Sequence, residues 1–341
     1  MQTATVAQGR SISDQIGSNH TRRARSARRA LLLAAAAVTV GSVAQSSHAT
    51  SYNWDPGHVA ATTGGGTGTW DTASSNWFNS TDQVWPNTNP NTDNAIFGNA
   101  ATAATVTIQG ASAAALNVFA NQVTFSSANY TLTGSAGSTL TLSGTAPAIS
   151  TSGGTAAISV PIVLGANANF TTTNTLTLNS GAVISGNFGI THVGPGFLTL
   201  VSNSSFSGGI NNISGSIGLQ IAPTTSTASA IGSGTFTSAG GVSMNNNLTS
   251  TAIQLINNLQ SYSAATNVLF SAGSTPYLNM GTGAATLTGN TTFSVRFGSV
   301  GSGQTPGGTF VIGGNVGETG GSFGITMGSP ATVNSVANVI A

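Results

Sequence analysis

Few side chains in this sequence are able to do acid–base chemistry. Among 341 residues there are six carboxylates, seven cationic side chains, four histidines and no cysteine. Hydrolysis of a glycosidic bond commonly needs two carboxyl groups roughly 5 to 10 Å apart, and elimination needs a base beside a cation. Apart from tyrosines, residues 99–341 offer only Glu318, Arg296 and His192. None of the three has a second carboxylate nearby in sequence, so we predict no enzyme activity, and Glu318 and Arg296 would at most form a salt bridge.

The four aspartates of residues 50–98 are the candidates for a metal site. They are Asp55, Asp71, Asp82 and Asp93. Successive members are at least eleven residues apart, whereas a calcium loop gathers its oxygen ligands within about a dozen positions. We therefore predict that these aspartates cap turns. His58 and His192 are too isolated for a zinc site, which needs three or four ligands, and we expect both to be solvated or at the edge of a strand row. No metal or cofactor is predicted.

All four tryptophans fall within residues 54–85, and they are the candidate ligand-binding residues. They are Trp54, Trp70, Trp77 and Trp85. Exposed indole rings stack on sugar rings, so the cluster is a candidate glycan-binding site. The alternative, which we favour, is that the rings cover the apolar cross-section at one end of a repetitive fold. Solvent-exposed indole rings would support glycan binding, and buried rings would support the covering role.

Charge is concentrated at the N-terminus. Six of the seven arginines lie in the first 29 positions. Residues 50–341 contain one arginine and five carboxylates. Neutralising a row of phosphates needs several clustered cations, and attachment to anionic lipids needs them too. We expect no nucleic acid partner and no electrostatic binding to membranes.

Residues 1–49 have the composition of a signal peptide. An arginine-rich stretch at 22–29 precedes an apolar core at 30–40, and small residues follow. These are the three parts of a secretory signal, and the core is shorter than the roughly 20 residues that span a bilayer. We predict cleavage near Ala49, with Ala44 as an alternative site. The mature chain would then be secreted or held at the bacterial cell surface, without a stable membrane span.

Residues 99–341 alternate apolar and small polar side chains. Segments such as ATVTIQ, STLTLSG and NTLTLNSG are interrupted by Gly, Ser and Asn. Period-two alternation predicts strands with one buried face. A sandwich or a barrel uses such strands, but the region is long for one ordinary sandwich, and recurring similar segments favour stacked coils of about 20 to 24 residues. We predict an all-β solenoid over 99–341, preceded by an aromatic-rich capping region at 50–98.

One window has a more specific pattern. Residues 157–220 contain an apolar-Pro-apolar strand, a TLTL strand and a Gly-x-Gly-x-Leu-Thr-Leu segment, followed by a Ser-Gly-Gly corner and a closing strand with Gly215 and Leu219. This window resembles the autotransporter-associated β-strand repeat, most clearly over 186–220. Gly208 and Gly209 would permit positive φ at the tight corner. The chain departs from the family pattern at His192, Pro195 and Ser204, and the text around Trp70 and Asp93 resembles the region that commonly precedes such repeats.

The resemblance implies a secreted or surface-displayed passenger with a right-handed parallel β-helix, and it implies no catalytic activity. We therefore expect an exported, non-enzymatic structural or adhesin-like element at the cell surface. Its partners would be extracellular polysaccharide or other surface components. The alternative is the non-catalytic portion of a carbohydrate-active β-helix protein, for which a carboxylate cluster on one face would be the distinguishing feature.

Overall fold

The computed structural model describes residues 49–59, 64–99, 102–127, 129–221, 228–248, 253–255, 257–263, 266–270, 277–297 and 309–328. Within these ranges the chain is all-β, with one 3-10 turn, η1 (Ala111–Ala113), beside the strands. The described residues, which begin at Ala49, belong to one compact unit. The described residues contain no helix of the length and hydropathy that a membrane span requires.

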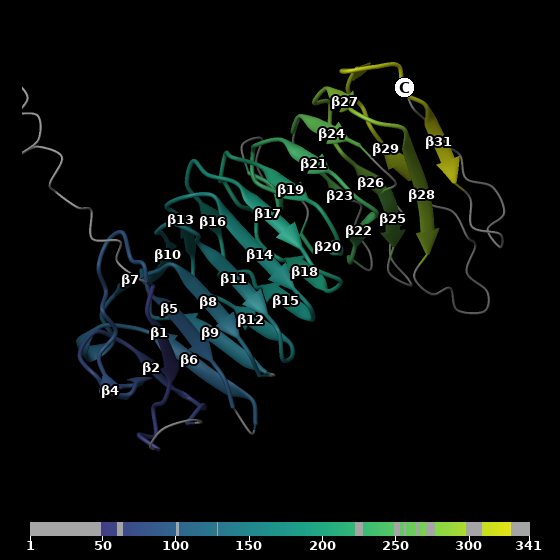
Figure 1. Ribbon diagram of the computed structural model, residues 1–341. Helices are drawn as coiled ribbons and strands as arrows, with labels where there is room; N and C mark the ends of the chain where they lie inside the picture. The colour runs from purple at the N-terminus through teal and green to yellow at the C-terminus, as the bar shows by residue number, and fades with distance from the viewer. Residues whose placement is uncertain are drawn as a thin grey trace, which may run out of the picture. The chain divides into compact units, whose positions relative to one another are not determined.

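Two long sheets run through the array (Figure 1). The first has thirteen strands, in the order β4 (Thr81–Gln83), β3 (Trp77–Asn79), β1 (Ser51–Trp54), β5 (Asn94–Phe97), β8 (Gln122–Phe125), β11 (Ala148–Thr151), β14 (Ala168–Thr172), β17 (Ile190–Val193), β19 (Ile210–Asn212), β21 (Phe236–Ser238), β24 (Gln260–Tyr262), β27 (Ala285–Leu287) and β30 (Val316–Glu318). The second has eleven, β2 (Gly68–Trp70), β6 (Ala104–Ile108), β9 (Tyr130–Gly134), β12 (Ala156–Ile158), β15 (Thr175–Leu178), β18 (Phe197–Leu200), β20 (Ser216–Leu219), β22 (Val242–Asn246), β25 (Thr266–Phe270), β28 (Thr291–Phe297) and β31 (Ile325–Gly328).

Two shorter sheets form a third side. One contains β7 (Asn117–Ala120), β10 (Thr139–Leu142), β13 (Ile162–Leu164) and β16 (Ile184–Ser185), and the other β23 (Ile253–Gln254), β26 (Tyr277–Asn279) and β29 (Thr309–Val311). Between these two sheets, the described residues of the third side have only an isolated bridge, which joins Ser204 to Ser229. Passing along the chain, successive strands visit the first sheet, the second sheet and then the third side, an arrangement compatible with a β-solenoid.

The pairing is parallel from one coil to the next, and coil length varies. Ile190 lies beside Ile210, twenty residues later, while Ala285 lies beside Val316, thirty-one residues later. The expected 20 to 24 residues per coil therefore holds in the middle of the array and is exceeded elsewhere. The additional residues fall in the corners between strands, where they leave the strand register unchanged.

Alternation along each strand builds the core. In β10 and β15 every second residue is buried, and inward side chains of successive coils stack, as Leu140, Ile162 and Ile184 do on the third side. Each such side chain contributes about 1.5 to 3 kcal/mol by leaving water. The core is thus a set of columns of stacked side chains, and each coil contributes one residue to each column.

The first coils differ in strand direction. Here β3 pairs with both β1 and β4 in antiparallel orientation, whereas β1 pairs with β5, and β2 with β6, in parallel. The strands of residues 50–98 are therefore continuous with the sheets that follow.

The glycine corner at 208–209 partly corrects the sequence-based expectation. Gly209 has φ of 80°, a conformation that L side chains rarely adopt. Gly208 lacks a positive φ, but a Cβ there would lie 2.2 Å from the backbone nitrogen of Gly189 in the preceding coil. Close packing of coils, and not backbone handedness, therefore requires glycine at position 208.

Candidate functional site

The four tryptophans lie inside the first coils. Each is at most 1% exposed, and their rings contact one another: the centroids of Trp70 and Trp77 are 4.9 Å apart, and those of Trp54 and Trp77 are 5.1 Å apart. Because a stacking platform must present a ring face to solvent, this arrangement contradicts the glycan-stacking role considered for Trp54, Trp70, Trp77 and Trp85. Dense ring packing is their role in the structure.

The aromatic cluster continues into the following coils. Phe97 stacks on Phe125 with centroids 5.3 Å apart and lies 5.4 Å from the ring of Tyr130. The Tyr130 hydroxyl donates to the Gly98 carbonyl at 2.8 Å and accepts from the Gly66 amide at 3.1 Å. Burial raises the pKa of Tyr130, so the group is a neutral structural link.

Two of the aspartates bond to nearby backbone amides, as predicted. The Asp71 Oδ1 atom accepts from the amides of Ala73 at 2.8 Å and Ser74 at 2.5 Å. Asp55, which is 2% exposed, accepts from the Val59 amide at 3.2 Å. Among the described residues, no three His, Cys, Asp or Glu side chains are grouped closely enough to hold a metal ion.

Asp93 makes a longer-range contact. Its Oδ1 accepts from the Thr50 amide at 3.2 Å. Burial raises the pKa of the Asp93 carboxyl, and the hydrogen bonds from Thr50 oppose that shift. This aspartate therefore ties the beginning of β1 to the segment that leads into β5.

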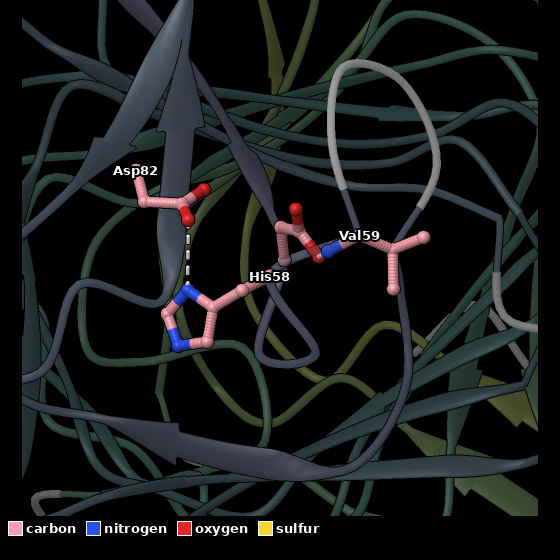
Figure 2. Close-up of polar contacts among 4 residues, drawn as sticks. His58, Val59 and Asp82 are labelled. Atoms are coloured by element: carbon pink, nitrogen blue, oxygen red, sulfur yellow. Dashed lines mark hydrogen bonds and ion pairs between the residues drawn. The ribbon is translucent and has the colours of Figure 1, made fainter.

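Asp82 pairs with His58, which the sequence did not suggest. The Nδ1 atom of His58 lies 3.0 Å from Oδ2 of Asp82, and Figure 2 shows the imidazole facing the carboxylate. Sequence spacing gave no signal because the pair depends on the antiparallel hairpin of β3 and β4, which carries Asp82, and on the φ of 52° at His58. An aspartate that orients a histidine supplies two members of a nucleophilic triad. No hydroxyl hydrogen-bonds to the second ring nitrogen of His58 in the described part of the chain.

His192 is fully buried, contrary to the solvated or strand-edge position expected for it. In the register of the first sheet it lies between Phe170 and Asn212, on an inward-facing column. Its Nε2 lies 2.8 Å from the Thr172 hydroxyl, and its Nδ1 lies 2.8 Å from Oδ1 of Asn212. An amide oxygen only accepts, so Nδ1 carries the proton and the Thr172 hydroxyl donates to Nε2.

The surroundings of His192 favour its neutral form. Burial lowers the pKa of His192, and the hydrogen bond to Asn212 only partly opposes this. The side chains that contact it, Thr172 and Asn212, carry no charge. The group is therefore suited to holding neighbouring coils together and is shielded from any external substrate.

Glu318 and Arg296 occupy different sheets. Glu318 ends β30 of the first sheet, is exposed, and accepts a 3.1 Å hydrogen bond from the Phe323 amide. Arg296 belongs to β28 of the second sheet, where its backbone pairs with Leu269. The Arg296 side chain lies outside the described residues, and so does the postulated salt bridge.

A hollow on the outer face of the first sheet was missed by the sequence reasoning. It has a volume of about 240 Å³ and lies over β17, β19 and β21. Its side-chain hydroxyls and amides come from Asn167, Thr191, Asn211, Thr235 and Thr237. In the sequence, the hollow is marked only by Thr and Asn at outward positions of the strands. Because many coils have such residues, this pattern could not locate the hollow.

Glycines form the floor of the hollow. Gly189, Gly208 and Gly209 belong to the corners that precede β17 and β19. A Cβ at any of the three would lie within 2.7 Å of backbone in a neighbouring coil, and the coil from Ile190 to Ile210 has twenty residues. The hollow therefore lies where short coils pack closely at glycine corners.

Comparison of the chain with protein-family models, with curated proteins and with solved structures finds no match.

Proposed function

We propose that this protein is an exported, non-enzymatic β-solenoid that acts as a structural or adhesive element at the cell surface. The single observation that best supports this is a continuous outward row of uncharged residues along the first sheet. From β8 to β27 the row is Gln122, Ala148, Asn169, Thr191, Asn211, Thr237, Ser261 and Thr286. Strands in such a sheet are about 4.8 Å apart, so the row presents hydroxyl and amide groups at a regular interval, interrupted at Ala148.

The stacked parallel coils also support a right-handed β-helix of the passenger type. A strand, crossover and parallel strand in one sheet is right-handed in nearly all proteins. The window 186–220, where the resemblance to autotransporter-associated repeats is clearest, includes short coils: Ile190 pairs with Ile210 twenty residues later, and Phe197 pairs with Ser216 nineteen residues later. In this proposal the aromatic cluster of residues 50–98 covers one end of the apolar core.

Export is the first part of the proposal to test. Residues 1–48 lie outside the described residues, and the proposal for them rests on the arginine-rich, apolar and small-residue order of the sequence. Expression of the full chain in a bacterial host, followed by mass spectrometry of the mature N-terminus and protease treatment of intact cells, should reveal cleavage near Ala49 and surface exposure. Recovery of an uncleaved protein from the cytoplasm would contradict it.

The alternative is the non-catalytic portion of a carbohydrate-active β-helix protein. Both proposals predict no turnover, which is tested by incubating the full-length protein with neutral and acidic polysaccharides while reducing ends and unsaturated products are followed. Retention on a polysaccharide without turnover agrees with the adhesive role. Turnover that disappears in Glu318→Gln or Arg296→Ala would replace the proposal with an enzymatic one.

A further inference from the structure

The hollow over β17, β19 and β21 is lined by uncharged side chains, several of them polar. Thr191, Asn211 and Thr237 lie in register on the three neighbouring strands, which are adjacent in the middle of the array in Figure 1. Three strands at a spacing of about 4.8 Å cover roughly 10 Å along the array. This length suits a disaccharide-sized stretch of a chain molecule.

The side chains of the hollow retain hydrogen-bonding capacity. Oδ1 of Asn167 accepts from the Gly189 amide at 2.8 Å, which orients the side chain and leaves its amino group available to donate. Oδ1 of Asn211 has no hydrogen-bond partner in the described part of the chain. This oxygen is buried. The terminal torsion of asparagine is soft, so rotation of the side-chain amide would let a ligand hydroxyl reach the oxygen.

The charge of the hollow limits the ligand class. All of its lining residues are neutral, so a phosphate, sulfate or carboxylate would find no cation to compensate its lost hydration. Phe188 directly precedes Gly189 and is 39% exposed, and its carbonyl accepts from the Gly208 amide at 3.2 Å. The hollow thus combines amides, hydroxyls and a neighbouring exposed aromatic residue, the set of groups that recognises uncharged, hydroxyl-rich rings.

We propose that this hollow, defined by Asn167, Thr191, Asn211, Thr235 and Thr237, is a binding subsite for a neutral polysaccharide. The inference rests on the adhesive form of the proposed function and moves the glycan contact from the buried tryptophans to the outer face of the first sheet. Hydroxyls of the glycan bond to the Asn and Thr side chains, and the glycine floor lets the sugar approach the backbone.

The test compares two matched double variants in the full-length protein. Asn211→Val/Thr237→Val removes one amide and one hydroxyl from the hollow. Gln122→Val/Thr286→Val removes the same groups from the same outward row, at positions that do not line the hollow. Valine suits strands, and thermal unfolding by circular dichroism verifies that both variants fold as the parent does.

Retention is measured on immobilised neutral β-glucan, galactan and mannan, with alginate and a sulfated galactan as anionic comparisons. We expect the parent to bind a neutral polymer, the hollow variant to bind at least about tenfold more weakly because two hydrogen bonds are lost, and the row variant to bind as the parent does. Equal binding by both variants would overturn the site but leave the adhesive proposal intact. Preference for the anionic polymers would overturn the ligand class.

Two further outcomes separate this inference from the proposed function. If the parent binds no polysaccharide but is displayed on cells, the subsite is wrong and the structural form of the proposed function stands. If light scattering shows self-association that the hollow variant alone loses, the occupant is a second copy of the chain and the glycan inference is wrong. Failure of both surface display and retention would overturn the two proposals together.

Discussion

The interior of the first coils is filled mainly by apolar and aromatic side chains, whereas the interior of the middle coils also contains buried polar side chains. One inward column of the first sheet contains Val123, Ile149 and Phe170 in successive coils. The same column continues as His192, Asn212 and Ser238, all buried. Neighbouring coils supply hydrogen bonds to His192, to Oδ1 of Asn212 and to Ser238, while Nδ2 of Asn212 is buried without a partner in the described part of the chain. The change teaches that this scaffold accepts polar residues inside when most of their polar atoms are paired between coils.

The two interiors also differ in what specifies the register between coils. The rings around Trp77 fill volume and depend on shape, whereas His192 depends on polar atoms of Thr172 and Asn212 in the adjacent coils. Apolar contacts tolerate sliding better than directional hydrogen bonds do. We therefore expect the first coils to be destabilised most by shortening a buried aromatic side chain. The middle coils should be destabilised by replacing a buried polar side chain with an apolar one, or by protonating His192.

The largest effect is expected for Trp77→Ala. This ring is fully buried among Trp54, Trp70 and Phe97, so its removal leaves a large cavity and should lower the free energy of unfolding by about 3 to 5 kcal/mol. Denaturant titration followed by tryptophan fluorescence and circular dichroism measures the loss. Phe197→Ala is the control, since Phe197 is 42% exposed and should cost less than about 1 kcal/mol. Equal losses in the two variants would show that the aromatic cluster adds no special stability.

The next effect is expected for His192→Leu. The substitution leaves the Thr172 hydroxyl and the Asn212 amide buried without their partner, and each orphaned group costs about 1 to 3 kcal/mol. Adding Thr172→Val and Asn212→Leu should restore part of the loss, because no polar group then remains unpaired. Unfolding free energies of the single and triple variants test this, and a triple variant less stable than His192→Leu alone would refute the hydrogen-bonded interpretation.

A pH titration of stability examines the same group without changing its shape. The pKa of His192 is lowered in the folded protein from the ordinary 6.5, so the unfolded chain binds the proton more readily. Stability is therefore complete above about pH 6.5 and falls as pH drops toward the folded pKa, with a slope of at most about 1.4 kcal/mol per pH unit. The raised pKa of Asp93 acts with the opposite sign and at lower pH. His192→Gln should flatten the slope between pH 5 and 6.5, and an unchanged slope would assign it to another group.

Much of this architecture could be predicted from the sequence, because strand alternation and glycine corners are local signals. The strands TLTL at 139–142 and 175–178 alternate as expected, and parallel coils follow from their repetition. The buried state of His192 could not be predicted, since alternation assigns a face only when the register is known and polar residues are usually assigned outward. Likewise the hollow depends on coil length, which is set by corners that vary without changing the strand pattern.

The smallest effect is expected for the exposed pair of His58 and Asp82. Both side chains are more than a third exposed, at 47% and 37%, so solvent screens the attraction and either His58→Gln or Asp82→Asn should cost less than about 0.5 kcal/mol. Raising the salt concentration should remove most of that difference. A larger and salt-insensitive loss would place this hairpin among the elements that hold the first coils together.

The parallel pairing of neighbouring coils has a consequence for how the molecule comes apart. In the described part of the chain, strand pairing joins each of these coils to the coil before it and the coil after it, so we expect cooperativity to pass mainly between neighbouring coils, as in other repeat proteins. Opening should then begin where the terminal coil has a single neighbour and proceed inward, instead of involving all coils at once. Amide hydrogen exchange would record this as a gradient of protection, with faster exchange at the end of β27 and β30 than at the first coils, because the aromatic cluster holds the latter end together.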